Sequence, residues 1–306
     1  MEKISGFSLV RNGLRFDYPF LESWRSLLPL VDELILNIGK SEDETLLIAE
    51  KFAKEEGGGK IKIFQSLWPL DDPEKKRSGL ILSEQTNLAL DQCQNDICFY
   101  LQADEVLHED DYRLIRNAVE LISKKVEIEA IVFRYQHFYG SFNVYQETRS
   151  AYRREVRLIK KSSGARSVGD AQSFLKKDEV KLNALLSDIR IFHYGWVRQP
   201  EAMKEKTEFM DQLYHGAQTA ESGLPHSGDN YRYKRFWGLK LYQGSHPAVM
   251  EKRILEKGWN WDLKTSAFVF TSGDFKKVLL DLWEKFTGHR PFEFKNYRIC
   301  EKINSR

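Results

Sequence analysis

Short apolar runs alternate with stretches of helical periodicity through the first half of the chain. Residues 4–10, 33–37, 60–65 and 96–102 are mainly apolar and are bounded by polar loops, which is typical of buried strands. Apolar residues between and after these runs recur three and four positions apart, as on one buried face of a helix. These stripes are Phe20, Leu21, Trp24, Leu27 and Leu28; Ile48, Ala49, Phe52 and Ala53; residues 80–90; and Leu114, Ile115, Ala118, Val119 and Ile122. Strands joined by helices predict an α/β open sheet, mostly parallel, with helices on both faces.

The second half of the chain is less regular. Residues 130–139, 155–161 and 188–194 have strand character, but helices do not separate them evenly. We therefore expect the later part of the sheet to be mixed or antiparallel.

A change of pattern at Pro200 predicts a second unit. From there the periodicity is helical, and a wide apolar stripe follows Asp274, which we predict to be a helix N-cap. Residues 218–244 mix Gly, Ser and Asn with aromatic residues and are expected to be irregular. We predict a domain of residues 1–199 and a mainly helical, aromatic-rich extension of residues 200–306.

Composition excludes several classes of protein. The 306 residues carry 47 basic and 45 acidic side chains, and a formal charge of +2 gives no field that favours nucleic acid. Cys93, Cys98 and Cys300 form no CxxC pair, which indicates a reducing compartment. The sequence has neither a signal-peptide pattern nor about 18 uninterrupted apolar residues. We expect no transmembrane segment and a cytoplasmic location, either free or peripheral at the inner face of the membrane.

Two acids directly after the most apolar strand are candidate metal ligands. Ligands of open α/β sheets bind beyond the carboxyl ends of the strands, where Asp104 and Glu105 are expected. Two carboxylates suffice for Mg²⁺ or Mn²⁺ when a diphosphate and water complete the shell. The alternative is a solvated turn before a helix that Asp110 or Asp111 caps.

Other candidate residues each have two interpretations. His193 ends an apolar strand and is either a metal ligand or a hydrogen-bonded packing residue. Asp170 follows a glycine in a segment without periodicity and is either a general base or part of an Asx turn. The basic stretch from Arg149 to Arg166 either binds phosphate or forms the outer face of an edge strand.

The order of four segments resembles bacterial family-two glycosyltransferases with the GT-A fold. These segments are ISGFSLVRNG, LVDELILNIGKSEDET, LQADEV and HYGWV, and the resemblance covers about the first 200 residues. It implies transfer of a sugar, usually with inversion, from a nucleotide diphosphate donor to an acceptor. A UDP-sugar is the donor we expect, with a glycan, a lipid-linked molecule or a protein as the acceptor.

The resemblance also implies roles for individual residues. QADE, with Gln102 where the family commonly has an acid, corresponds to its metal-binding motif, so Asp104 and Glu105 would bind Mg²⁺ or Mn²⁺ and His193 would complete the shell. Asp170 falls where the catalytic base is expected. The positions expected to contact the nucleotide are Val10, Arg11, Asn12, Asn37, Asp43, Thr45 and Gln102.

These observations favour an inverting, metal-assisted glycosyltransferase of cell-surface polysaccharide biosynthesis. We further expect homo-oligomerisation through the C-terminal extension. Two alternatives remain open at this stage: a non-catalytic carbohydrate-binding or scaffold protein on the same fold, and a sugar nucleotidyltransferase. The sugar nucleotidyltransferase is disfavoured because the loop after the first predicted strand has no Gly-rich, Lys-bearing phosphate motif.

Overall fold

The structure is a computed structural model that describes residues 2–72, 74–75, 78–149, 151–215, 231–291, 293 and 295–303. Its strands are β1 (Ile4–Val10), β2 (Glu33–Gly39), β3 (Ile61–Ser66), β4 (Ile97–Tyr100), β5 (Glu105–Leu107), β6 (Ala130–Tyr139), β7 (Ser141–Gln146), β8 (Arg154–Lys160), β9 (Arg166–Val168), β10 (Ser173–Leu175), β11 (Leu182–Trp196), β12 (Leu239–Leu241) and β13 (Tyr297–Ile303). Its α-helices are α1 (Phe20–Leu27), α2 (Thr45–Glu55), α3 (Leu80–Gln92), α4 (Tyr112–Lys124), α5 (Pro200–His215), α6 (Glu251–Leu255) and α7 (Ser272–Thr287). Single 3-10 turns are η1 (Leu28–Leu30), η2 (Glu109–Asp111), η3 (Lys161–Ser163), η4 (Lys177–Glu179) and η5 (Ala248–Met250).

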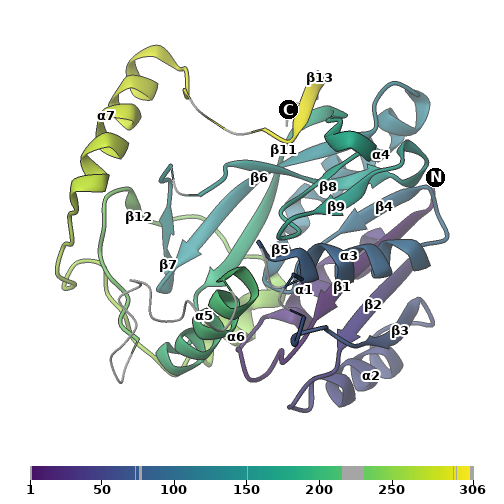
Figure 1. The fold of residues 1–306 in the computed structure, drawn as a ribbon, viewed down its shortest axis with the longest axis horizontal. Helices are drawn as coiled ribbons and strands as arrows, with labels where there is room; N and C mark the ends of the chain where they lie inside the picture. The colour runs from purple at the N-terminus through teal and green to yellow at the C-terminus, as the bar shows by residue number, and fades with distance from the viewer. Residues whose placement is uncertain are drawn as a thin grey trace.

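One large mixed sheet organises the molecule. Within the described residues its order is β12-β7-β6-β8-β4-β1-β2-β3, and β11 lies beside β6 with β5 and β13 as further neighbours (Figure 1). β4, β1, β2 and β3 are parallel, whereas β8 is antiparallel to both β4 and β6. The predicted open α/β sheet, parallel at first and mixed later, is confirmed.

Buried apolar runs explain why the first strands lie at the centre. Every residue of β1, β2 and β4 is buried, as expected for parallel strands covered on both faces. Trp24, Phe52 and Ile115 pack on one face from α1, α2 and α4. Leu90 of α3 and Phe174 of β10 pack on the other face. The predicted helices on both faces are therefore present.

Residues after 200 contribute both helices and strands. β12 pairs with β7, and β13 pairs in parallel with β11, so the late chain returns to the sheet. α7 lies at the edge of the molecule, away from the parallel strands (Figure 1). Its N-cap is Thr271 and not the predicted Asp274, which instead completes the capping box from the third helical position.

Two further sequence predictions concern the late chain. Residues 218–244 were expected to be irregular. Residues 218–230 lie outside the described residues, and residues 231–244 include the short strand β12. The domain boundary at residue 200 stays a prediction. No helix in the described part of the chain combines the length and hydropathy that a bilayer span requires.

Candidate active site

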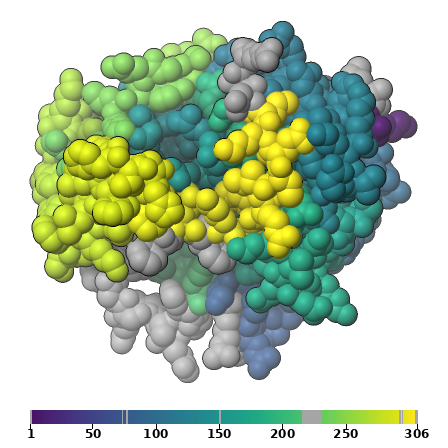
Figure 2. Space-filling view, turned by 90° about the horizontal axis from the view of Figure 1, so that it is seen from above, coloured from purple at the N-terminus to yellow at the C-terminus, as the bar shows by residue number. Residues whose placement is uncertain are grey.

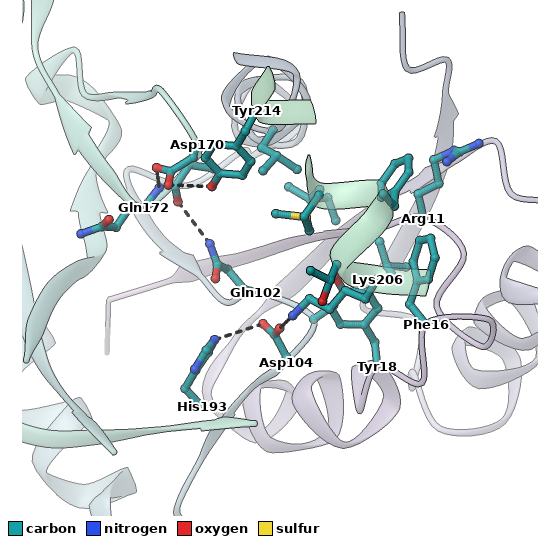
Figure 3. A pocket seen from close by; sticks show the side chains of 18 of the residues that line it. Arg11, Phe16, Tyr18, Gln102, Asp104, Asp170, Gln172, His193, Lys206 and Tyr214 are labelled. Atoms are coloured by element: carbon teal, nitrogen blue, oxygen red, sulfur yellow. Dashed lines mark hydrogen bonds and ion pairs between the residues drawn. The ribbon is translucent and has the colours of Figure 1, made fainter. Parts of the chain in front are cut away.

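A cavity of about 500 Å³ opens at the carboxyl ends of β1 and β4. Its walls come from Leu9 to Arg11, from the segment after β4, from the loop around Asp170, from the end of β11 and from α5. Figure 3 shows Asp104 with Lys206 on one side, Asp170 with Tyr214 on the other, and Gln102 between them. The sheet edge that sequence reasoning selected is thus a built pocket of ligand size.

Asp104 is the acidic centre of one wall. Its Oδ2 lies 3.4 Å from Lys206 Nζ and 3.7 Å from Arg198 Nη2, and its Oδ1 lies 3.8 Å from His193 Nε2. Burial raises the pKa of Asp104, but Lys206, His193 and Arg198 outweigh it and lower the pKa to about 2. Asp104 is therefore a carboxylate at any physiological pH.

Two buried cations surround that carboxylate. Lys206 Nζ donates to the carbonyl of Gly195 at 2.8 Å and lines the cavity. Burial and the neighbouring Arg198 lower the pKa of Lys206 to about 7, against the opposing effect of Asp104. Arg198 is fully buried, stacks on Tyr18 at 4.5 Å, and has no hydrogen-bond partner for Nε or Nη2 in the described part of the molecule. With both cations charged, one carboxylate leaves this wall with an excess of positive charge.

Glu105 does not face the cavity with Asp104, contrary to expectation. Arg157 holds both of its carboxylate oxygens at 2.8 Å, and the Tyr135 hydroxyl donates to Oε1 at 2.7 Å. Glu105 and Arg157 are fully buried beneath the cavity. Glu105 begins β5 and pairs with His193 of β11, but Arg157 and Tyr135 hold its carboxylate inside the protein, and Glu105 does not line the cavity. The prediction that both acids face the ligand cleft is therefore wrong for Glu105.

His193 lies at the cavity wall in a chain of hydrogen bonds. His137 Nε2 lies 2.7 Å from the Tyr152 carbonyl, so this nitrogen must be the donor. His137 Nδ1 then accepts from His193 Nδ1 at 3.0 Å, which leaves His193 Nε2 unprotonated beside Asp104. Burial is the main reason that the pKa of His193 falls to about 4, so the ring is neutral near pH 7.

The donor set does not fit a resident Mg²⁺ or Mn²⁺. Asp104 and His193 supply one carboxylate and one nitrogen, too few to hold either ion unless water and a bound phosphate provide the other oxygen ligands. No third His, Cys, Asp or Glu joins them in a metal-binding cluster among the described residues. Lys206 lines the cavity beside Asp104, and Arg198 is buried 3.7 Å from the same carboxylate, so a divalent ion bound to Asp104 would be repelled by both.

Asp170 is presented by a loop on the opposite wall. Its Oδ1 accepts from the Gln172 backbone at 3.2 Å, and its Oδ2 accepts from the Tyr214 hydroxyl at 2.8 Å. Gln102 Nε2 donates to the Ala171 carbonyl at 3.2 Å and so ties the loop to the end of β4. A Cβ on Gly79 would lie 2.9 Å from Asp170 Cβ, so the close approach of α3 requires glycine there. Both sequence interpretations of Asp170 are compatible with this geometry, because an Asx turn places the carboxylate at the cavity.

The predicted nucleotide contacts divide into two groups. Val10, Arg11 and Gln102 line the cavity, whereas four other predicted residues do not. Three of those four, Asn12, Asp43 and Thr45, hold the loop after β1 by hydrogen bonds. The fourth, Asn37, is buried and bonds to Gln85 and Ser66.

Aromatic side chains form the remaining end of the cavity. The Arg11 guanidinium lies 5.2 Å from the centre of the Phe209 ring, and Phe209 also stacks on Phe16 at 5.2 Å. Trp68 lies 6.3 Å from Phe209 and packs against Gly39, where a Cβ would lie 2.5 Å from the indole nitrogen. Sequence reasoning missed Trp68, Phe209, Lys206 and Arg198. The signal that could have found Lys206 was its place on α5 three residues after Met203, about one helical turn along the same face.

A second cavity of about 800 Å³ lies between β6, β7, β12 and α7. Tyr152 lines both cavities. Basic side chains exceed acidic ones in the second: Arg134, Arg153, Arg154, Arg235, Lys240, Lys285 and Arg290 against Glu147, Asp281 and Glu284. Among the described residues, the predicted basic stretch thus contributes Arg153 and Arg154 to this cavity and Arg157 to the buried pair with Glu105.

Comparisons with known proteins give partial structural likenesses. No family model matches the chain, and no curated protein does. The solved structure of Staphylococcus aureus TarS 1-349 shares 14% identity over 69% of this chain and 65% of its own, with a TM-score of 0.36. TarS 1-349 in complex with UDP-GlcNAc shares 19% identity over 44% of this chain and 34% of its own, with a TM-score of 0.31. Glucosyl-3-phosphoglycerate synthase from Mycobacterium tuberculosis, in complex with Mn²⁺, UDP and phosphoglyceric acid, shares 19% identity over 44% of this chain and 43% of its own, with a TM-score of 0.31. At these TM-scores the likenesses assign neither fold nor function, so both are argued from the chain's own residues.

Proposed function

We propose that the chain is a glycosyltransferase that moves a sugar from a nucleoside diphosphate donor to an acceptor hydroxyl. The observation that carries the proposal is one cavity at the carboxyl edge of parallel strands, with Lys206 on one wall, Asp170 on the other, and Arg198 buried near Lys206 beside Asp104. Positive charge on one wall can neutralise a diphosphate, and a carboxylate on a loop can accept the proton of an attacking hydroxyl. Sugar transfer from a nucleoside diphosphate requires both of these roles in one site.

Lys206 is the residue proposed to neutralise the departing diphosphate. Its ammonium is held by Asp104 and by the Gly195 carbonyl, so it is oriented before the donor binds. Arg198, buried behind it with two nitrogens free of hydrogen bonds in the described molecule, adds to the positive potential. Preorganised charge in a water-poor site stabilises a developing anion at little reorganisation cost.

The aromatic end is proposed to hold the nucleoside. Trp68 and Phe209 offer ring faces to a planar base, and Arg11 offers a guanidinium that already stacks on Phe209. The cavity volume of about 500 Å³ lies within the range of roughly 300–1,000 Å³ that is usual for small-ligand sites. UDP is the nucleotide with which we would begin.

Asp170 is proposed to be the general base. In the transfer it accepts the acceptor hydroxyl proton while that oxygen forms a bond to the anomeric carbon. The bond from this carbon to the diphosphate oxygen breaks, and its electron pair leaves with the nucleoside diphosphate. Tyr214 holds the carboxylate in place through its hydroxyl. Attack from the face opposite the leaving group inverts the anomeric centre.

The second cavity is proposed to receive the acceptor. It shares Tyr152 with the donor cavity, so a ligand in it would lie next to the reacting centre. Its excess of arginine and lysine favours an acceptor that carries phosphate or carboxylate groups. A role in cell-surface polysaccharide synthesis is consistent with such an acceptor and stays a prediction.

Thermal unfolding with nucleotides tests the proposal first. The purified chain is heated with UDP, GDP, CDP or ADP, each in EDTA and in Mn²⁺, and a ligand at 100 times its dissociation constant should stabilise it by about 2.7 kcal/mol. Release of nucleoside diphosphate from the matching sugar nucleotide then measures turnover. Binding without turnover would favour the non-catalytic alternative, and release of pyrophosphate would favour a nucleotidyltransferase.

A further inference from the structure

Helix α7 turns its apolar face away from the protein. Five large side chains on it are 41–88% exposed: Phe275, Leu279, Leu282, Trp283 and Phe286. Their spacing of four, three, one and three residues places them along a single stripe. The helix is the yellow mass at the left of Figure 2, where its side chains stand open to the viewer.

The opposite face of α7 is held by ion pairs. Arg149 donates to the Leu280 carbonyl at 2.9 Å and lies 3.3 Å from Glu284. Arg153 pairs with the same carboxylate at 2.7 Å, and Trp237 donates to Asp281 at 3.0 Å. Polar contacts thus dock the helix on the second cavity. Its apolar stripe therefore adds nothing to the core of the described molecule.

Charge on α7 distinguishes the two faces further. Asp281 and Glu284 point inward to arginines, whereas Lys276 and Lys285 are exposed on the two borders of the apolar stripe. The outward face therefore presents aromatic and aliphatic groups with basic flanks. Helices of this composition lie in the headgroup region of anionic bilayers.

A second copy of the chain fits this face less well. In a two-fold dimer the same patch meets itself, so the lysines that border each stripe would approach one another at the rim. An anionic lipid surface instead pairs those lysines with headgroups. Phe268 and Phe270, half exposed and stacked at 6.2 Å, precede the helix in the chain, and Phe268 also lines the second cavity.

We infer that the outward face of α7 is a surface that binds anionic membranes. Trp283 and Phe286 enter the boundary between headgroups and acyl chains, and Lys276 and Lys285 contact the headgroups. The chain lies on the membrane by this surface and does not cross it. This inference does not depend on the proposed donor site, because it uses no residue of the donor cavity, although Lys285 also lines the second cavity.

Vesicle sedimentation of the full chain tests it. Vesicles of phosphatidylcholine with phosphatidylglycerol should bind the chain more tightly than vesicles of phosphatidylcholine alone. Trp283→Ser and Phe286→Ser should each weaken binding by about tenfold or more, as the loss of a large buried apolar group predicts. Lys276→Gln and Lys285→Gln should each lower the affinity for anionic vesicles about fivefold and change the affinity for neutral vesicles little.

The matched control is Leu255→Ser on α6, because Leu255 is 77% exposed but lies on another helix. It should bind vesicles like the unmodified chain, and all variants should unfold at the same temperature. Failure of the unmodified chain to bind anionic vesicles would overturn the inference. So would a dimer in solution that dissociates in Trp283→Ser while vesicle binding stays unchanged.

Discussion

Replacing Lys206 by methionine isolates the proposed diphosphate contact. Methionine keeps an unbranched chain of similar length, so the packing of α5 is preserved while the ammonium is lost. The change leaves Asp104 beside Arg198 and His193 and leaves the aromatic end untouched. The variant therefore tests the charge and not the fold.

The expected loss follows from the geometry. Lys206 Nζ lies 3.4 Å from Asp104, and a phosphate oxygen at the same distance would attract it by about 5 kcal/mol at an effective dielectric constant of roughly 20. Desolvation consumes part of this, and hydrogen bonds to charged groups contribute about 1.5–3 kcal/mol net. UDP should therefore bind the variant about 10- to 150-fold more weakly.

Titration calorimetry with UDP, first in EDTA and then in Mn²⁺, measures the dissociation constant of each variant. The unmodified chain should bind UDP with the same dissociation constant in both, because Lys206 and Arg198 already neutralise the diphosphate. Lys204→Met is the control, since Lys204 is on the same helix but outside the cavity, and it should bind normally. The reasoning is refuted if Lys206→Met binds UDP normally, or if the unmodified chain needs Mn²⁺ to bind.

Three further changes test other parts of the molecule. Asp170→Asn should lower the transfer rate about 10²- to 10⁴-fold in steady-state assays while the dissociation constant for the donor stays the same; an unchanged rate would remove Asp170 from catalysis. Glu105→Gln should lower the free energy of unfolding by about 3–5 kcal/mol in denaturant titrations, because it leaves the buried Arg157 without its counter-ion; a loss below about 1 kcal/mol would contradict the buried pair. Burial is the main reason that the pKa of Glu155 rises from its ordinary 4.5 to about 7. The folded state therefore binds this proton more tightly than the unfolded state does. The stabilisation is complete below pH 4.5 and is lost as the pH rises through 7. This loss is about 3 kcal/mol, and Glu155→Gln should abolish that part of the pH dependence in unfolding titrations between pH 5 and 8.

Sequence patterns were sufficient for the central strands of the sheet because most residues of these strands are buried. β1 and β6 begin and end at the predicted residues, and in β6 only Arg134 and, in part, Gln136 are not buried. The sequence placed Asp104 correctly at the cavity, because the carboxyl end of β4 lies beside the carboxyl ends of its parallel neighbours. An apolar run thus predicts a strand, and the parallel arrangement of the strands then determines that their carboxyl ends lie together.

The missed residues depend on contacts that no local pattern contains. Lys206 and Asp104 are 102 positions apart in the chain, and Arg198 reaches the carbonyl of Phe16 from 182 positions away. Glu105 was misplaced because β5 has three residues, too few to give an alternating pattern that could be recognised. Sequence spacing therefore predicted which strand end forms the site, but not which late helix closes over it.

If both proposals hold, the two faces of α7 would link the acceptor to the membrane. The inner face, with Asp281 and Glu284, lines the cationic second cavity, and the outer face carries Trp283 and Phe286. A helix that lies on a bilayer by its outer face would hold this cavity one helix diameter, about 10–12 Å, from the lipid surface. An acceptor that joins an anionic head to a lipid chain could occupy the cavity without leaving the membrane. On this argument the lipid-linked acceptor is favoured over a soluble glycan or a protein, and transfer to it should fall in Trp283→Ser while UDP binding stays unchanged.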